Sequence, residues 1–422
     1  MSEFIQNKEY RQNKLKELIK RLHDGATVEE VQEEFNRLTD GVTPTEIAEM
    51  EQALVREGMP VADIQRLCDV HAAVFKGSIE DIHKDDAVPP VYSAGHPILT
   101  LKAENVAIQA LIDNDVLPGL ESYMKDDSAA AKDSLTAALG KLMTIERHYS
   151  RKENLIFPIM EKYDITAPPQ VMWGVDDEIR DKIKSVLAAL ATEPISAAQL
   201  SEMLSDAVVQ IGEMIFKEEE IMIPMVLEKF SVEDWVQIEK SSAEIGYTLI
   251  VSPVRWEQST DQKSTSNQPA PQESTEIAAG PGMVQLNSKT KVKFDAGSLT
   301  AEEINAILNT VPLDMTFVGA DDKVRYFTQG KERVFDRPLT IIGRQVKHCH
   351  PPKSVHIVEQ IVADLKSGKK DNEDFWIKMG EVFAYIRYFA VRNKKGEFLG
   401  TLEVTQNIKH ITELEGEKRL MS

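Results

Sequence analysis

The stretch HYSRKENLIFPIMEKY (148–163) returns in altered form later in the chain, as MIFKEEEIMIPMVLEKF (214–230). With Pro158 set over Pro224, KENLIFP aligns with EEEIMIP, and a Glu-Lys-aromatic run follows each copy. Ten residues before its proline the first copy has a histidine, whereas the second has a methionine. A helical hairpin that is used twice can enclose a site between its copies, so the repeat predicts a bundle of facing helices with unequal donor groups.

The composition is that of an ordinary globular chain with several domains. The 422 residues are 42% hydrophobic and 28% charged, which is enough for roughly two to four domains. The formal net charge of -20 argues against binding to nucleic acid or to anionic membranes, because both need basic patches. No apolar run has the length of a membrane span, and the N-terminal sequence lacks a signal peptide. Cys68 and Cys349 lie in different regions, which fits a reducing cytoplasm.

Changes in pattern divide the chain into four parts. Residues 1–83 have repeated capping boxes and glycine stops, which indicate a small bundle of short helices. Residues 96–247 are helical again, and residues 252–282 are rich in Gln, Ser, Thr and Pro, which is typical of a flexible linker. Residues 290–412 change to an α+β pattern. The long helices are expected at 96–124, 128–160, 169–191 and 197–227, with a trailing helix at 232–245, as in an up-and-down bundle.

The C-terminal part combines alternating strands with a helix. An Asp-Asp turn separates two of the strands, and the run Asn393–Gly396 has the composition of a hairpin turn. The predicted order is strands 315–318 and 324–327, helix 354–365, and antiparallel strands 375–379, 382–392 and 398–405. The sequence therefore predicts an antiparallel sheet with helices.

Facing helices in a bundle can bind metal when they direct histidine and carboxylate side chains inward. The candidates share an oxygen or imidazole donor and a place on these helices: His96, Glu104, His148, Glu153, Asp176, Glu218 and Glu219. Such a donor set suits iron or manganese better than a metal that prefers thiolates.

These segments resemble known families. Residues 96–247 are similar to a hemerythrin-like (HHE cation-binding) domain through GHP (95–97), HYSRKENLIFP (148–158), VMWGVDDEIR (171–180) and FKEEEIMIP (216–224). Residues 1–83 resemble the helical domain of unknown function that precedes such domains. Residues 290–412 resemble a PAS sensor domain through GRQVKHCHPPKSVHIVEQI and YFAVRNKKGEFLGTLEVTQNI. The resemblance implies a mainly α protein, with a small helical bundle, an up-and-down four-helix bundle and an α+β PAS domain.

The resemblance also implies non-haem iron, but this sequence departs from the family's ligand pattern. The family commonly has a Glu four residues after the helix-two His, where this chain has Lys152. Met214 stands where the helix-four His is expected, and Asp176 replaces a helix-three His. The residues expected to bind metal are His96, His148, Glu153, Asp176 and Glu218. Two alternatives stay open: a site for one or two ions, or a lost site in which Lys152 supplies the positive charge.

For function, the domain pairing favours a cytoplasmic sensory protein over an enzyme. We find no phosphate-binding loop, kinase signature or nucleophile elbow. Output is expected through a protein partner or through a homodimer of the PAS domain. The alternative is a non-haem iron protein that handles oxygen, nitric oxide or reactive oxygen species. In some PAS domains a histidine at the place of His356 binds haem, so His356 is a candidate haem or ligand residue.

Overall fold

The computed structural model describes residues 52–59, 94–126, 128–192, 195–256, 290–335 and 337–417, with single residues between 10 and 37. The predicted N-terminal bundle (1–83) and linker (252–282) therefore lie largely outside the described residues. Contacts divide the chain into two compact units. The helical unit comprises the residues up to Gln258 together with Pro338–Arg344 and His348–His356, and the second unit comprises the rest.

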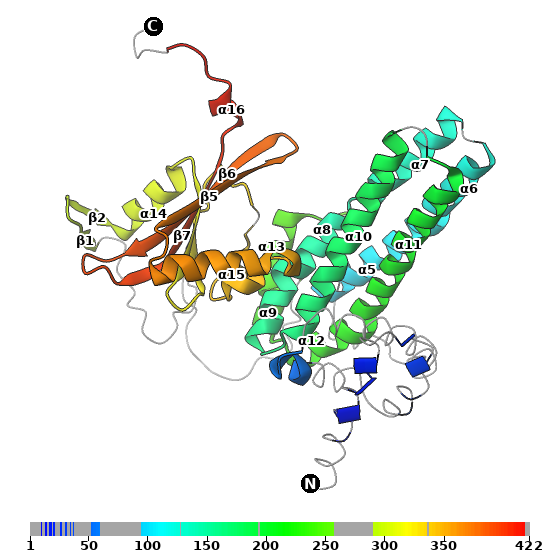
Figure 1. Cartoon of the computed structure of the whole chain (residues 1–422), viewed down its shortest axis with the longest axis horizontal. Coiled ribbons are helices and arrows are strands. Elements are labelled where there is room, and N and C mark those ends of the chain that lie inside the picture. The colour runs from blue at the N-terminus through cyan, green and yellow to red at the C-terminus, as the bar shows by residue number, and fades with distance from the viewer. Residues whose placement is uncertain are drawn as a thin grey trace. The chain divides into compact units, whose positions relative to one another are not determined.

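Long helices running side by side form the helical unit (Figure 1). Its elements are α5 (Pro97–Leu111), η1 (Ile112–Val116), α6 (Leu117–Lys125), α7 (Ala129–Leu142), α8 (Ile145–Arg151), η2 (Lys152–Ile156), α9 (Phe157–Lys162), α10 (Ala167–Ala191), α11 (Ala197–Phe216), η3 (Lys217–Met222), α12 (Ile223–Lys229) and α13 (Val232–Ile245). The ends of these helices match the four long segments and the trailing helix predicted from sequence within a few residues.

Local sequence explains where the helices begin. The hydroxyl of Ser128 accepts from the backbone N–H of Ala131 and caps α7. Ser196 with Gln199, and Ser231 with Asp234, form complete capping boxes at α11 and α13. Each cap satisfies N–H groups that the first helical turn leaves without a partner, which contributes about 1 kcal/mol. A continuous core of Leu, Ile, Val and Met side chains then fills the space between the helices.

Three short π-helical turns interrupt the long helices, and each ends two positions before a proline. In η1, η2 and η3 the N–H that follows the turn bonds to the carbonyl five residues earlier. The prolines Pro118, Pro158 and Pro224 occupy the next position. Because proline has no N–H, it cannot complete the α-helical ladder, and a π turn accommodates it without a break. The repeated stretch of sequence therefore encodes a repeated π turn.

The second unit is built on a five-stranded antiparallel sheet with the order β4-β3-β7-β6-β5. Figure 1 labels three of its strands, β5, β6 and β7. The strands are β3 (Asp314–Gly319), β4 (Val324–Phe327), β5 (Asn372–Met379), β6 (Val382–Arg392) and β7 (Phe398–Asn407). A two-stranded ribbon, β1 (Lys291–Lys293) and β2 (Ser298–Thr300), precedes α14 (Ala301–Thr310), and α16 (Lys409–Thr412) follows the sheet. Of the other helical elements, η4 (Leu339–Ile341) belongs to the helical unit, and the division between the units falls within η5 (Val346–Cys349) and α15 (Pro352–Ser367).

Helix α15 packs on the sheet through Leu365, whose neighbours in the core are Ala384, Ile386 and Tyr388 of β6. The prediction of a mainly α protein with a C-terminal antiparallel α+β part is thus confirmed. The ribbon β1–β2 was not predicted, because its strands are too short to show an alternating pattern.

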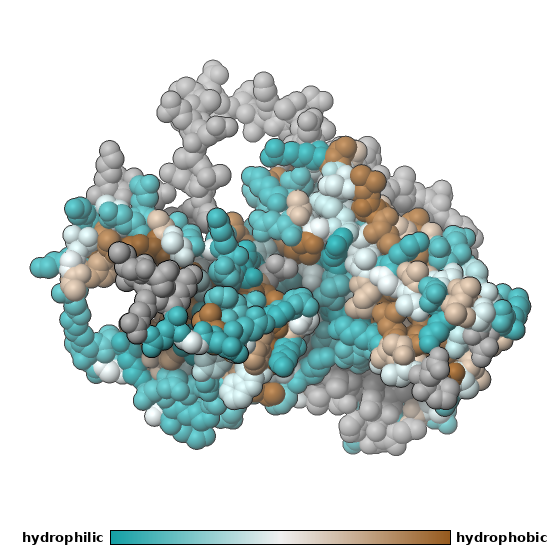
Figure 2. All heavy atoms as spheres, turned by 90° about the horizontal axis from the view of Figure 1, so that it is seen from above, coloured by the Kyte–Doolittle hydropathy of each residue, from teal (hydrophilic) through white to brown (hydrophobic). Residues whose placement is uncertain are grey.

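In Figure 2 hydrophilic residues cover most of the viewed face and apolar residues form separate patches. None of the helices described here has both the length and the apolar character needed to cross a membrane.

Candidate functional site

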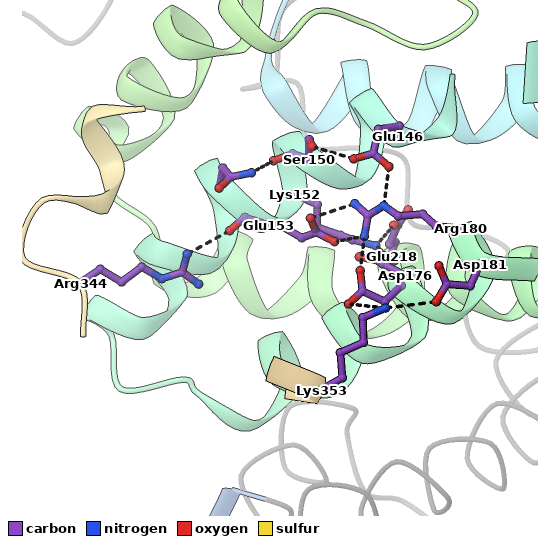
Figure 3. Close-up of polar contacts among 12 residues, drawn as sticks. Glu146, Ser150, Lys152, Glu153, Asp176, Arg180, Asp181, Glu218, Arg344 and Lys353 are labelled. Atoms are coloured by element: carbon purple, nitrogen blue, oxygen red, sulfur yellow. Dashed lines mark hydrogen bonds and ion pairs between the residues drawn. The ribbon is translucent and has the colours of Figure 1, made fainter. Parts of the chain in front are cut away.

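Charged side chains from the five elements α5, α8, η2, α10 and η3 meet inside the helical unit, where the core is otherwise apolar. We call this set the buried charge cluster; its members are Glu104, His148, Arg151, Lys152, Glu153, Asp176, Arg180 and Glu218. All of them are more than nine-tenths buried. Figure 3 shows several of them directed toward one another from η2, α10 and η3.

Lys152 lies at the centre of the cluster. Its Nζ donates to Asp176 Oδ1 at 2.8 Å and also to Glu218 Oε1. The ammonium sits 4.4 Å from the centre of the Tyr149 ring. Burial lowers the pKa of Lys152, but the two carboxylates outweigh burial and raise it above its ordinary value. Lys152 is therefore a cation held between two carboxylates from different helices.

His148 lies between the carboxyl groups of Glu104 and Glu218. Its Nδ1 is 2.8 Å from Glu104 Oε2, and its Nε2 is 3.0 Å from Glu218 Oε2. Burial lowers the pKa of His148, but Glu218 and Glu104 raise it more, so the imidazole is protonated more readily than usual. For Glu218, burial is likewise outweighed by Lys152 and His148, and its pKa falls to about 2. In this arrangement each ring nitrogen of His148 faces a carboxyl group, so neither nitrogen is directed at an open position for a metal.

Two arginines complete the cluster. Arg180 pairs with both oxygens of Glu153, through Nη1 at 2.8 Å and Nη2 at 2.9 Å, and its Nε reaches Glu146 at 2.6 Å. Arg151 donates to Glu104, which also accepts from the backbone N–H of Thr248 at 2.7 Å. Basic side chains therefore alternate with carboxyl groups throughout the cluster: Arg151, Lys152, Arg180 and His148 contact Glu104, Glu153, Asp176 and Glu218.

His96 has a different role in the structure. Its Nδ1 accepts from the backbone N–H of Ile98 at 3.2 Å and caps α5. Its ring packs against Trp235, with ring centres 4.9 Å apart, and against Trp256, at 4.7 Å. Burial lowers the pKa of His96 to about 4, so the ring is neutral at physiological pH. Along α5 it lies about two helical turns before Glu104.

Of the residues predicted to bind metal, the structure brings His148, Asp176 and Glu218 together around Lys152. Glu153 instead lies with Arg180, and His96 lies with the two tryptophans. In the parts of the chain that the structure describes, no group of three or more His, Cys, Asp or Glu residues is arranged to hold a metal ion. Because Lys152 and both nitrogens of His148 already engage the carboxylates, the donor set does not fit a metal in this arrangement.

Sequence reasoning did not identify Arg151 and Arg180 as parts of the site. The signal that could have found Arg180 is its spacing of four residues from Asp176, which places both on one face of α10. His356 lies exposed on α15, whose buried residues are Val358, Val362, Asp364 and Leu365. Binding of haem or another ligand at His356 stays a prediction.

Comparison with known proteins agrees with this architecture. Residues 96–226 match the hemerythrin HHE cation binding domain, residues 304–409 match a PAS domain, and residues 15–81 match a family of unknown function (DUF438). No curated protein is similar in sequence to the chain.

Solved structures are similar to parts of the chain. A C-terminal domain from Streptococcus mutans is 37% identical, covering 31% of this chain and 100% of that one, with a TM-score of 0.30. A PAS domain from Colwellia psychrerythraea is 12% identical over 26% of this chain and 97% of that one, with a TM-score of 0.22. A sensory box sensor histidine kinase from Vibrio cholerae is 9% identical over 24% of this chain and 87% of that one, with a TM-score of 0.20. The chain therefore joins a region of the DUF438 family, a hemerythrin HHE domain and a C-terminal PAS domain.

Proposed function

We propose that this chain is a cytoplasmic signalling protein whose HHE bundle works without a metal ion, because the ammonium of Lys152 takes the place of the metal charge. The bundle is coupled to the PAS sensor domain, and the signal leaves through contacts with a protein partner or a second copy of the chain. The observation that carries the proposal is the position of Lys152 Nζ between Asp176 and Glu218.

Charge explains why lysine suits this place. Two carboxylates that are buried together repel each other and resist ionisation unless a cation lies between them. In a metal site the cation is the ion itself, and the ligands direct lone pairs at it. Here the carboxyl oxygens of Asp176 and Glu218 accept from the N–H groups of Lys152, and Glu218 also contacts His148. The bundle core is thus neutralised by the chain's own side chains.

The sensory part of the proposal is supported by the pairing of the two domains in one chain. The net charge of -20 favours a protein partner over nucleic acid as the recipient of the signal. We do not assign an enzymatic reaction, since the cluster's carboxylates are all engaged by cations and none is left as a free base.

Metal content of the 422-residue protein tests the proposal. We expect far less than one iron or manganese per chain after purification without oxygen and incubation with excess ferrous iron or manganese. An absorption spectrum of the same sample should lack bands from an iron centre or haem. One or two firmly bound irons per chain would overturn the proposal and favour a non-haem iron protein that handles oxygen, nitric oxide or reactive oxygen species.

In contrast to the wild type, the Lys152→Glu variant should bind a metal ion. It removes the central cation and puts a carboxylate four residues after His148, next to Asp176 and Glu218. We expect Mn²⁺ to raise the melting temperature of this variant, since a ligand present at a hundred times its Kd stabilises the folded state by about 2.7 kcal/mol. Mn²⁺ should leave the wild type and the surface control Lys141→Glu unchanged. Equal stabilisation of all three proteins would contradict the prediction.

A further inference from the structure

A second group of contacts joins η2 and α9 to Pro338–Arg344, the first of the two later segments in the helical unit. The hydroxyl of Thr340 donates to the backbone carbonyl of Asn154 at 2.5 Å. The guanidinium of Arg344 donates to the carbonyl of Glu153 at 3.4 Å. It also pairs with both oxygens of Glu161, through Nε at 2.7 Å and Nη2 at 2.8 Å. Figure 3 shows Arg344 directed at the η2 turn.

The π turn explains why these two carbonyls can accept. In an α-helix the Asn154 carbonyl would bond to the N–H of residue 158, but Pro158 has none. The Glu153 carbonyl would bond to the N–H of Phe157, which in η2 bonds instead to the carbonyl of Lys152. The turn therefore releases two adjacent main-chain acceptors from the helical ladder, and Thr340 and Arg344 donate to them.

The ion pair between Arg344 and Glu161 is buried, and its hydrogen bonds are charge-assisted. The side chain of Arg344 is 2% exposed and that of Glu161 is 8% exposed. The guanidinium also lies 5.5 Å from the centre of the Trp173 ring. Burial alone would raise the pKa of Glu161, but His348 and Arg344 outweigh it and hold the pKa below its ordinary value. Such a paired, planar arrangement is stronger and more specific than a single hydrogen bond between neutral groups.

We infer that the carbonyls of Glu153 and Asn154 together with Glu161 form a docking site for the segment 338–344, and that this contact couples the segment to the turn that carries Lys152. Residues 338–344 lie within the stretch that matches a PAS domain, although the structure assigns them to the helical unit. A change in the η2 turn would move both acceptors, and a displaced segment would leave both carbonyls without their donors. The biological role of this coupling rests on the proposed signalling function.

Hydrogen exchange on the 422-residue protein tests the docking site. In Arg344→Ala we expect amides of 338–344 to exchange at least about tenfold faster, because local opening controls exchange. The amides of 152–156 should also exchange faster, because coupling between two sites is reciprocal. The control is Arg325→Ala, which removes an exposed pair with Asp321. Glu161→Gln leaves the arginine in place and should give the same pattern more weakly.

Three outcomes decide the inference. Faster exchange in both segments for both variants supports docking and coupling. Faster exchange at 338–344 alone overturns the coupling, and no change relative to Arg325→Ala overturns the docking site. Metal content measured on the same samples separates this inference from the proposed function: bound iron with coupled exchange would sink the function and leave the docking site standing.

Discussion

Lys152→Met is expected to lower the free energy of unfolding of the helical unit by about 3–5 kcal/mol, the usual cost of removing one partner from a buried ion pair. Methionine fills similar space but leaves Asp176 and Glu218 facing each other without the cation between them. The loss follows from unpaired buried charge rather than from a cavity. Urea unfolding can be followed by tryptophan fluorescence, since Trp173, Trp235 and Trp256 lie in the helical unit.

Two comparisons make this prediction specific. Lys141→Met removes an exposed lysine 3.9 Å from Asp115 and should cost less than about 1 kcal/mol. Adding Asp176→Asn to Lys152→Met removes one of the two unpaired charges and should restore part of the lost stability. If Lys152→Met is no more destabilising than Lys141→Met, then Lys152 does not balance the charge of the cluster.

Arg180→Met should destabilise the helical unit by a similar amount, about 3–5 kcal/mol at neutral pH. Arg180 holds both oxygens of the buried Glu153. Burial raises the pKa of Glu153 and Arg180 opposes this rise. Without Arg180 the pKa of Glu153 would rise further, so the folded state would take up a proton that the unfolded state releases.

The loss of stability caused by Arg180→Met should therefore depend on pH in a defined direction. When a carboxyl pKa is higher in the folded state, stability is retained below the unfolded pKa and falls as pH rises toward the folded pKa. Arg180→Met should therefore cost less at pH 5 than at pH 8, as measured by urea unfolding at both values. Arg147→Met, which removes an exposed arginine, is the control. An equal loss at both pH values would show that Glu153 stays ionised and that packing explains the effect.

Local sequence was sufficient to predict most of the helices and strands. Ser128, Ser196 and Ser231 fix helix starts through contacts within three residues, so no knowledge of the fold was needed. The strands of β6 and β7 were predictable because alternation has a period of two along the chain. The long helices were predicted as continuous, and the π turns were missed, although each ends two positions before a proline.

The site was harder to predict because its contacts join distant parts of the sequence. His148 was placed correctly in the bundle, but its partners Glu104 and Glu218 come from helices far along the chain. His96 was expected to bind metal together with His148, yet its ring packs on Trp256, which lies in the stretch predicted as a linker. The sequence left open whether Lys152 supplies the positive charge of a lost metal site. Its contacts with Asp176 and Glu218, which join distant parts of the sequence, favour that alternative.

The pairing of basic side chains with carboxyl groups in the cluster has a consequence for how the sequence can evolve. Any single substitution that removes or adds a charge there leaves an unbalanced charge inside the core, which is strongly destabilising. Viable changes should therefore come as compensated pairs or, where a carboxylate replaces Lys152, together with acquisition of an ion. Among homologues, the positions of Lys152, Asp176 and Glu218 should covary, and so should those of Arg180 and Glu153.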